Sequence, residues 1–159
     1  MPVSSWRCRK VGAACDSGDV RVTGRDLERI PPGNLWVPRG EFGALWVAAE
    51  KLTSANGERG IADWVPAGVA LTCRWVARAV SETANAQRLP VRAPVTGRRV
   101  LAFEEAIEAE YLAAETMLVR ASPPALVRSQ PGYVEAVSAT LRWAWRATGS
   151  APVLVPVAE

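Results

Sequence analysis

Residues 57–80 read GERGIADWVPAGVALTCRWVARAV and contain the longest apolar run in the chain. The spacing of apolar residues predicts a helix from about Ala67 to Glu82, with Pro66 in its first turn, where the missing N–H is tolerated. Because Arg74 interrupts the run well short of the roughly 18 uncharged residues that a bilayer requires, we expect no membrane partner. Residues at three- and four-residue steps form one stripe that faces a core: Val69, Cys73, Val76 and Val80.

A second apolar patch lies outside this stripe, where Leu71 and Trp75 fall beside arginines. The last helical segment repeats this combination around Trp143. Tryptophan and arginine are enriched at the hot spots of protein interfaces, so both patches are candidate interaction surfaces. A second layer of the same core explains the two tryptophans equally well. The candidate interface residues are Leu71, Arg74, Trp75, Arg78, Arg142, Trp143 and Arg146.

Three further segments have helical spacing: about 41–53, 97–120 and 132–148. Asn56-Gly57 and Gly149 are the expected stops, and Thr96 is the expected cap of the long third helix. The fold class is therefore mainly α, a single-domain bundle of about four main helices. Residues 1–40 form an irregular N-terminal segment packing on the bundle, with DVRVTG as a candidate short strand. The bundle occupies 41–150, and 151–159 form an extended C-terminal tail.

The connection IPPGNLWVPRG, residues 30–40, precedes the first long helix. Its consecutive prolines favour an extended, turning path. We expect this path to lay Leu35, Trp36 and Val37 across the domain.

The composition is that of an ordinary globular protein, with 159 residues, 49% hydrophobic and 22% charged. The formal charge of +3 is too small to imply a polyanionic partner. Histidine is absent, which removes the usual general base and the commonest metal ligand, so we expect neither a metal nor another cofactor. Three cysteines without an export signal favour a cytoplasmic protein with reduced thiols. The preference for arginine over lysine suggests a bacterial source.

The carboxylates of the segment 97–120 have two interpretations, as a metal site and as structural groups. Glu104, Glu108 and Glu115 share one face of the expected helix, and without histidine a solvated face is the better interpretation. Glu110 lies on the flank of the apolar stripe. We predict that it pairs with an arginine, Arg74 or Arg78 being the first candidates.

The leading hypothesis is a non-enzymatic interaction protein or accessory subunit of a larger bacterial assembly, which binds another protein or a second copy of itself through the Trp/Arg patches. The alternative is a nucleic-acid-binding accessory protein. Its basic residues would come from an arginine-rich loop: Arg88, Arg92, Arg98 and Arg99. Arg98 and Arg99 would place two positive charges at the positive end of the dipole of the helix expected to start near Gly97. This unfavourable position suggests that they have a role outside that helix.

An enzyme of unknown class is the third hypothesis. No nucleophile, phosphate-loop or dinucleotide motif is present in the sequence. Glu110, Tyr111 and Arg74 are the side chains from which a catalytic site would have to be built.

Overall fold

The structure, a computed structural model, describes residues 22–82 and 84–157. Within these ranges the chain forms six α-helices, one short 3-10 turn and one two-stranded hairpin, so the prediction of a mainly α bundle with four longer helices is confirmed. The elements are α1 (Gly24–Glu28), the 3-10 turn η1 (Pro32–Asn34), α2 (Arg39–Glu58), α3 (Trp64–Val76), β1 (Val80–Glu82), β2 (Arg88–Pro90), α4 (Glu104–Leu118), α5 (Ala125–Ser129) and α6 (Tyr133–Ala144).

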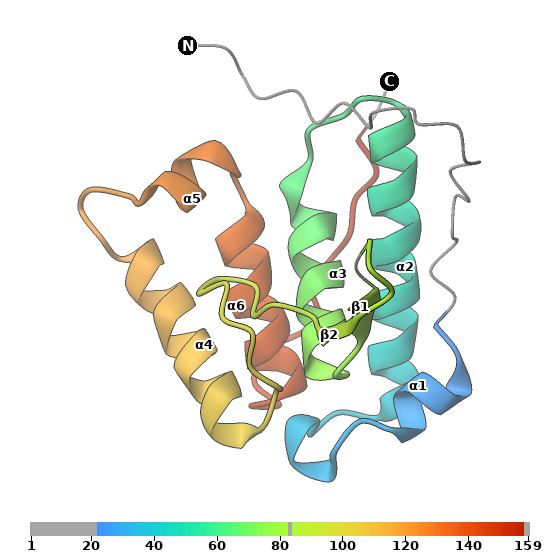
Figure 1. Cartoon of the computed structure of the whole chain (residues 1–159). Helices are drawn as coiled ribbons and strands as arrows, with labels where there is room; N and C mark the ends of the chain where they lie inside the picture. The colour runs from blue at the N-terminus through green and yellow to red at the C-terminus, as the bar shows by residue number, and fades with distance from the viewer. Residues whose placement is uncertain (1–21, 83, 158–159) are drawn as a thin grey trace.

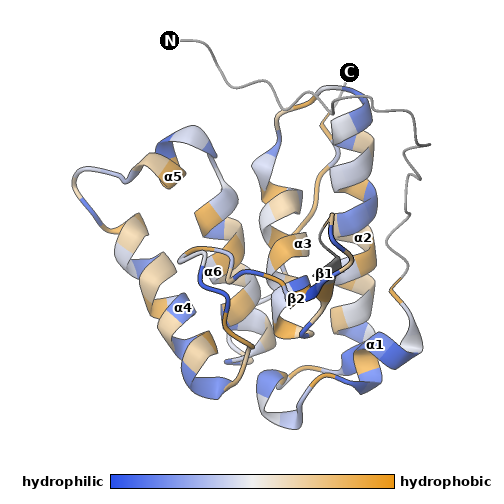
Figure 2. Ribbon diagram, in the orientation of Figure 1, coloured by the Kyte–Doolittle hydropathy of each residue, from blue (hydrophilic) through white to orange (hydrophobic). Residues whose placement is uncertain are grey.

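The four longer helices lie side by side in the order α2, α3, α6, α4, so α3 and α6 occupy the interior positions (Figure 1). The two strands are antiparallel, with Val80 opposite Pro90. Figure 2 shows hydrophobic residues concentrated along α3 and hydrophilic ones at α1 and at the beginning of α4. The apolar run of residues 64–76 thus forms α3, one of the two interior helices of the bundle.

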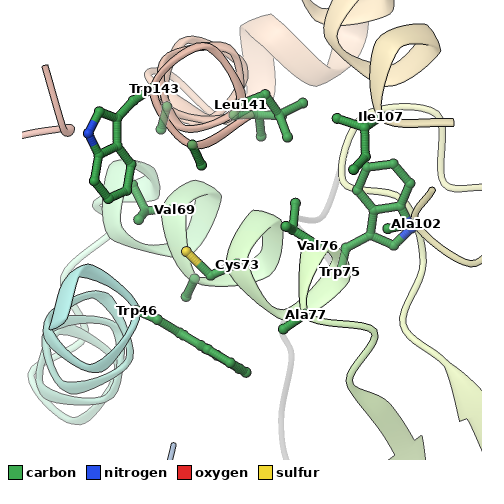
Figure 3. Close-up of a cluster of buried hydrophobic side chains, with 14 of the residues drawn as sticks. Trp46, Val69, Cys73, Trp75, Val76, Ala77, Ala102, Ile107, Leu141 and Trp143 are labelled. Atoms are coloured by element: carbon green, nitrogen blue, oxygen red, sulfur yellow. The ribbon is translucent and has the colours of Figure 1, made fainter. Parts of the chain in front are cut away.

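The core is built around α3 and includes Trp75 and Trp143, the two tryptophans of the candidate interaction surfaces (Figure 3). Trp75 is 1% exposed and Trp143 is 6% exposed. Three residues of the predicted stripe, Val69, Cys73 and Val76, are fully buried as expected. The alternative that treated the tryptophans as a second core layer therefore describes the fold.

The helix α2 continues past the predicted stop at Asn56-Gly57 and ends at Glu58. The Asn56 side chain is buried within the helix, 2% exposed. The positive φ that ends the helix belongs instead to Gly60, with φ 67°. Residues 54–58 are therefore helical, although the sequence predicted a helix that ends near residue 53.

The helix α3 ends at Val76, six residues before the predicted end at Glu82. Arg78 adopts a left-handed conformation with φ 55°, which stops the helix and turns the chain into β1. Val80 is therefore a strand residue, 47% exposed, and not a member of the core stripe. The N-terminus also differs, because Asp63 caps the helix by accepting the Val65 N–H at 3.1 Å.

The helix α4 begins at Glu104 and not near Gly97. The backbone of the preceding loop is held by the buried Glu110 carboxylate, which accepts hydrogen bonds from the Val95 N–H, the Thr96 N–H (2.9 Å) and the Thr96 hydroxyl (2.8 Å). These amides are satisfied without helix formation. The prediction that Glu110 pairs with Arg74 or Arg78 was wrong, because its partners are backbone and hydroxyl donors.

Close packing of α3 against α6 depends on Gly68. A Cβ at this position would lie 2.7 Å from the Tyr133 carbonyl oxygen and 2.9 Å from the Ala136 Cβ. Only glycine allows the two backbones to approach this closely without displacement.

The two terminal segments were expected to be irregular or extended. The candidate strand DVRVTG lies mostly outside the described residues, and its last three residues lead into α1, which Thr23 caps. Residues 151–157 have no regular secondary structure, and Ala151 and Leu154 pack against the core. Cys8, Cys15 and Trp6 lie outside the described part of the chain.

The buried Tyr133 provides a pH-dependent test of this core. Its hydroxyl donates to the Pro94 carbonyl at 2.8 Å, and burial together with the nearby Glu110 raises its pKa from 10 to about 12. The folded state therefore disfavours the tyrosinate, and the stabilisation present below pH 10 is lost as pH rises towards 12. We expect the free energy of unfolding to fall by about 2 kcal/mol over this interval.

Urea titrations at several pH values measure this decline. Burial also raises the pKa of the Cys73 thiol and adds to the decline, so Tyr133→Phe should flatten the slope without abolishing it. An unchanged slope in Tyr133→Phe would contradict the assignment.

Candidate functional site

The most accessible tryptophan among the described residues is Trp36, which follows the turn η1 and is 67% exposed. The backbone of Trp36 is held by a hydrogen bond, although its indole is exposed to solvent. Its backbone N–H donates to the Ala144 carbonyl at the end of α6, at 2.9 Å. Leu35, the residue before it, is extended and buried, so the alternation of an extended chain turns Trp36 outwards.

The turn that precedes Trp36 is anchored by the buried side chain of Asn34, 1% exposed. Its amide nitrogen donates to the Val76 carbonyl at 3.0 Å and to the Ala102 carbonyl at 3.1 Å. These bonds join the turn to the end of α3 and to the segment before α4. The exposed indole is thus presented from a rigid support.

A groove of about 450 Å³ lies between this segment, the beginning of α4 and the end of α6, at the lower end of the bundle in Figure 1. We call it the Trp36 groove. Aromatic and acidic side chains form most of its wall, and one arginine completes it. The lining residues are Trp36, Glu104, Glu105, Glu108, Trp145 and Arg146.

One wall of the groove contains Trp145, whose ring packs at a tilt against Tyr111, a buried residue that is not part of the lining. The Tyr111 and Trp145 ring centroids are 6.5 Å apart with an interplanar angle of 53°. The Arg146 guanidinium carbon lies 5.4 Å from the Tyr111 centroid, within cation–π range. The protein thus already places one guanidinium against an aromatic ring beside this groove.

The opposite wall carries negative charge. Glu104, Glu105 and Glu108 are all exposed, and against the single Arg146 they give the lining a formal charge of −2 (three carboxylates, one guanidinium). The first two belong to the first turn of α4, where the helix dipole also stabilises carboxylates. An exposed indole beside carboxylates is the combination that attracts a cationic side chain.

The predicted interface residues of α3 do not form an exposed patch. Trp75 is buried and its indole N–H donates to the Val100 carbonyl at 2.8 Å. Arg74 makes a two-point ion pair with the buried Glu50, each N–O distance being 2.5 Å. Leu71 is half-buried, and only Arg78 of this set is exposed. Trp75 belongs to the core because other segments of the chain pack against more than one side of α3.

The predicted interface residues around α6 are divided in the same way. Trp143 is buried, and Figure 3 places its indole and that of Trp75 on opposite sides of the core. Arg142 is exposed and lies 3.8 Å from a Glu115 carboxylate oxygen. Of this set, only Arg146 reaches the Trp36 groove.

Two of the four arginines proposed to bind nucleic acid instead donate hydrogen bonds to backbone carbonyls of their own loop. Arg92 donates to the Gly97 carbonyl at 3.0 Å, and Arg99 donates to the Pro90 carbonyl at 3.3 Å. Arg98 is exposed, and Arg99 is not at a helix end because α4 starts at Glu104. Arg88 points into a different groove, described below.

The residues proposed for an enzyme do not converge. Tyr111 packs against Trp145, Arg74 binds Glu50, and Glu110 holds the loop before α4. The three carboxylates expected on one helix face are also divided. Glu104 and Glu108 line the Trp36 groove, whereas Glu115 accepts a hydrogen bond from Ser138. Within residues 22–82 and 84–157 there is no group of three or more acidic or cysteine side chains placed to hold a metal ion.

No protein-family model matches this chain, and no curated protein or solved structure is significantly similar to it. Among the helices that the structure describes, each is too short or too polar to cross a bilayer. Function is therefore inferred from the chemistry of the surface.

Proposed function

We propose that this protein is a non-enzymatic binding subunit whose Trp36 groove receives a cationic segment of another protein. The observation that carries the proposal is the 67% exposed indole of Trp36, rigidly anchored beside three exposed carboxylates. An arginine of the partner would stack on the indole while its guanidinium pairs with the glutamates. Such a contact has the composition of an interface hot spot.

The proposed contact again pairs tryptophan with arginine, as the sequence led us to expect. It lies at the Trp36 groove and not at the patches around Trp75 and Trp143. Arg146 beside Tyr111 is an internal example of the contact, since a guanidinium already lies 5.4 Å from that ring. A bacterial cytoplasm remains the proposed setting, supported by the arginine-rich composition and by the free, buried Cys73 thiol.

A peptide titration tests the proposed chemistry. We expect the peptide Gly-Ser-Arg-Gly-Arg-Ser-Gly to bind with a Kd of about 0.1 mM at low salt, and its citrulline analogue, which lacks the charge, to bind at least about tenfold more weakly. Trp36→Ala and the double variant Glu104→Gln/Glu108→Gln should each weaken binding by about five- to tenfold. Isothermal titration calorimetry gives these constants.

The matched control is Glu135→Gln, which removes an exposed first-turn carboxylate from α6, outside the groove. It should leave the affinity unchanged. Equal binding of the citrulline peptide, or equal weakening in Glu135→Gln, would overturn the proposal because either result indicates nonspecific attraction.

A second copy of this chain is the other source of a cationic segment. Light scattering over a range of protein concentrations separates the two cases, since self-association should produce a dimer that Trp36→Ala dissociates. A protein that remains monomeric at all concentrations, and still binds the arginine peptide, has a different protein as its partner.

A further inference from the structure

A second groove, next to α1, the end of α3 and the hairpin, contains an unusual concentration of arginine. Its volume is about 680 Å³, within the range of small-molecule sites. Three arginines line it: Arg29 follows α1, Arg78 follows α3, and Arg88 begins β2. We call it the arginine groove, and none of its residues lines the Trp36 groove.

The arginines of this groove have no carboxylate partner among the described residues. Asp26 is the only acidic residue in the lining, and its carboxylate accepts two hydrogen bonds from Thr23, both at 2.8 Å, in the capping box of α1. The formal charge of the lining is therefore +2 (three guanidiniums, one carboxylate).

Arg78 is positioned by two features of the backbone. Its left-handed φ of 55° projects it from the turn after α3, and its Nε donates to the Ala102 carbonyl at 2.7 Å. This bond fixes one edge of the guanidinium and leaves the two terminal nitrogens available. A pre-oriented guanidinium fork suits a phosphate oxygen pair.

The remaining lining of the arginine groove is apolar. The apolar lining residues include Ala77, Ala79, Val80 and the buried Trp46. The neighbouring charged pair adds no free charge, because Glu50 is bound by Arg74 and by the Trp46 indole N–H at 3.0 Å. The groove thus offers cationic donors beside an apolar surface.

We propose that the arginine groove binds a small organic phosphate, a phosphate monoester joined to a planar or apolar group of about nucleotide size. The phosphate would contact Arg78 and Arg88, and the organic part would lie along the apolar lining. This binding is independent of the protein partner proposed for the Trp36 groove.

Titrations with AMP, ribose 5-phosphate and adenosine, followed by calorimetry at about 50 mM salt, test the phosphate and the organic part separately. We expect AMP to bind with a Kd below about 1 mM, ribose 5-phosphate to bind more weakly, and adenosine not to bind. Binding of AMP and ribose 5-phosphate with equal affinity would reject the role of the apolar lining, and absence of binding by both would reject the site.

Substitutions locate the ligand. Arg88→Gln lies on the exposed hairpin and should leave the fold intact, while Arg78→Gln removes the anchored fork; each should weaken AMP binding by about tenfold. Arg98→Gln, which changes an exposed arginine outside the groove, is the matched control and should have no effect. Equal losses in all three variants, or binding of single-stranded oligonucleotides without binding of AMP, would replace this proposal with a diffuse nucleic-acid surface.

Discussion

Trp75→Ala is expected to lower the free energy of unfolding by about 4 kcal/mol, whereas Trp36→Ala should change it by less than about 0.5 kcal/mol. The same chemical change is made at a site that is 1% exposed and at one that is 67% exposed. Loss of the Trp75 side chain leaves a cavity and removes the indole bond to the Val100 carbonyl.

Urea unfolding followed by far-ultraviolet circular dichroism measures both effects without relying on tryptophan fluorescence. Similar stabilities for the two variants would contradict the burial that separates core from candidate interface. A large loss in Trp36→Ala would show that its indole is a structural element, which would remove the basis of the Trp36 groove.

Glu50→Ala is expected to cost about 3 kcal/mol, because it leaves the Arg74 guanidinium and the Trp46 indole N–H without their acceptor. The Arg74 side chain is 32% exposed, so water can solvate the guanidinium once Glu50 is removed. The expected loss of stability therefore lies at the lower end of the range for breaking a buried ion pair. Replacing both members, as in Glu50→Gln/Arg74→Met, should recover part of the loss since no buried charge remains.

Glu58→Ala is the control for this prediction. It removes an exposed carboxylate from the same helix, α2, and should change the stability by less than about 0.5 kcal/mol. Denaturant titrations of the three variants give the comparison. A loss in Glu50→Ala no larger than that in the control would contradict a structural role for the ion pair.

Apolar periodicity was sufficient to predict the four longer helices and the buried stripe of α3. It did not predict the helix ends, because these depend on contacts distant in the sequence. Glu110 holds the backbone at Val95 and Thr96 out of the helix, and Arg78 rather than a glycine supplies the left-handed turn after α3. Sequence spacing contains no direct signal for either contact.

The sequence left open whether Trp75 and Trp143 belong to a surface patch or to the core, for a related reason. A helical wheel separates one core stripe from the remaining faces, which is adequate for a helix with one neighbour. The helix α3 has α2 on one side, α6 on another and the segment around Val100 against Trp75, so the second apolar patch is also core. The surrounding prolines, which favour extended backbone, were the available signal that Trp36 points away from its buried neighbour Leu35.

The position of the cationic contact can be measured directly from the indole N–H signals in a two-dimensional NMR spectrum, with the Trp36 signal assigned by Trp36→Phe. On addition of the arginine peptide, we predict that the Trp36 signal shifts while those of Trp75 and Trp143 stay in place, and that the citrulline peptide shifts none of them. An unmoved Trp36 signal, or a shift of Trp75 or Trp143 in its place, would contradict the account.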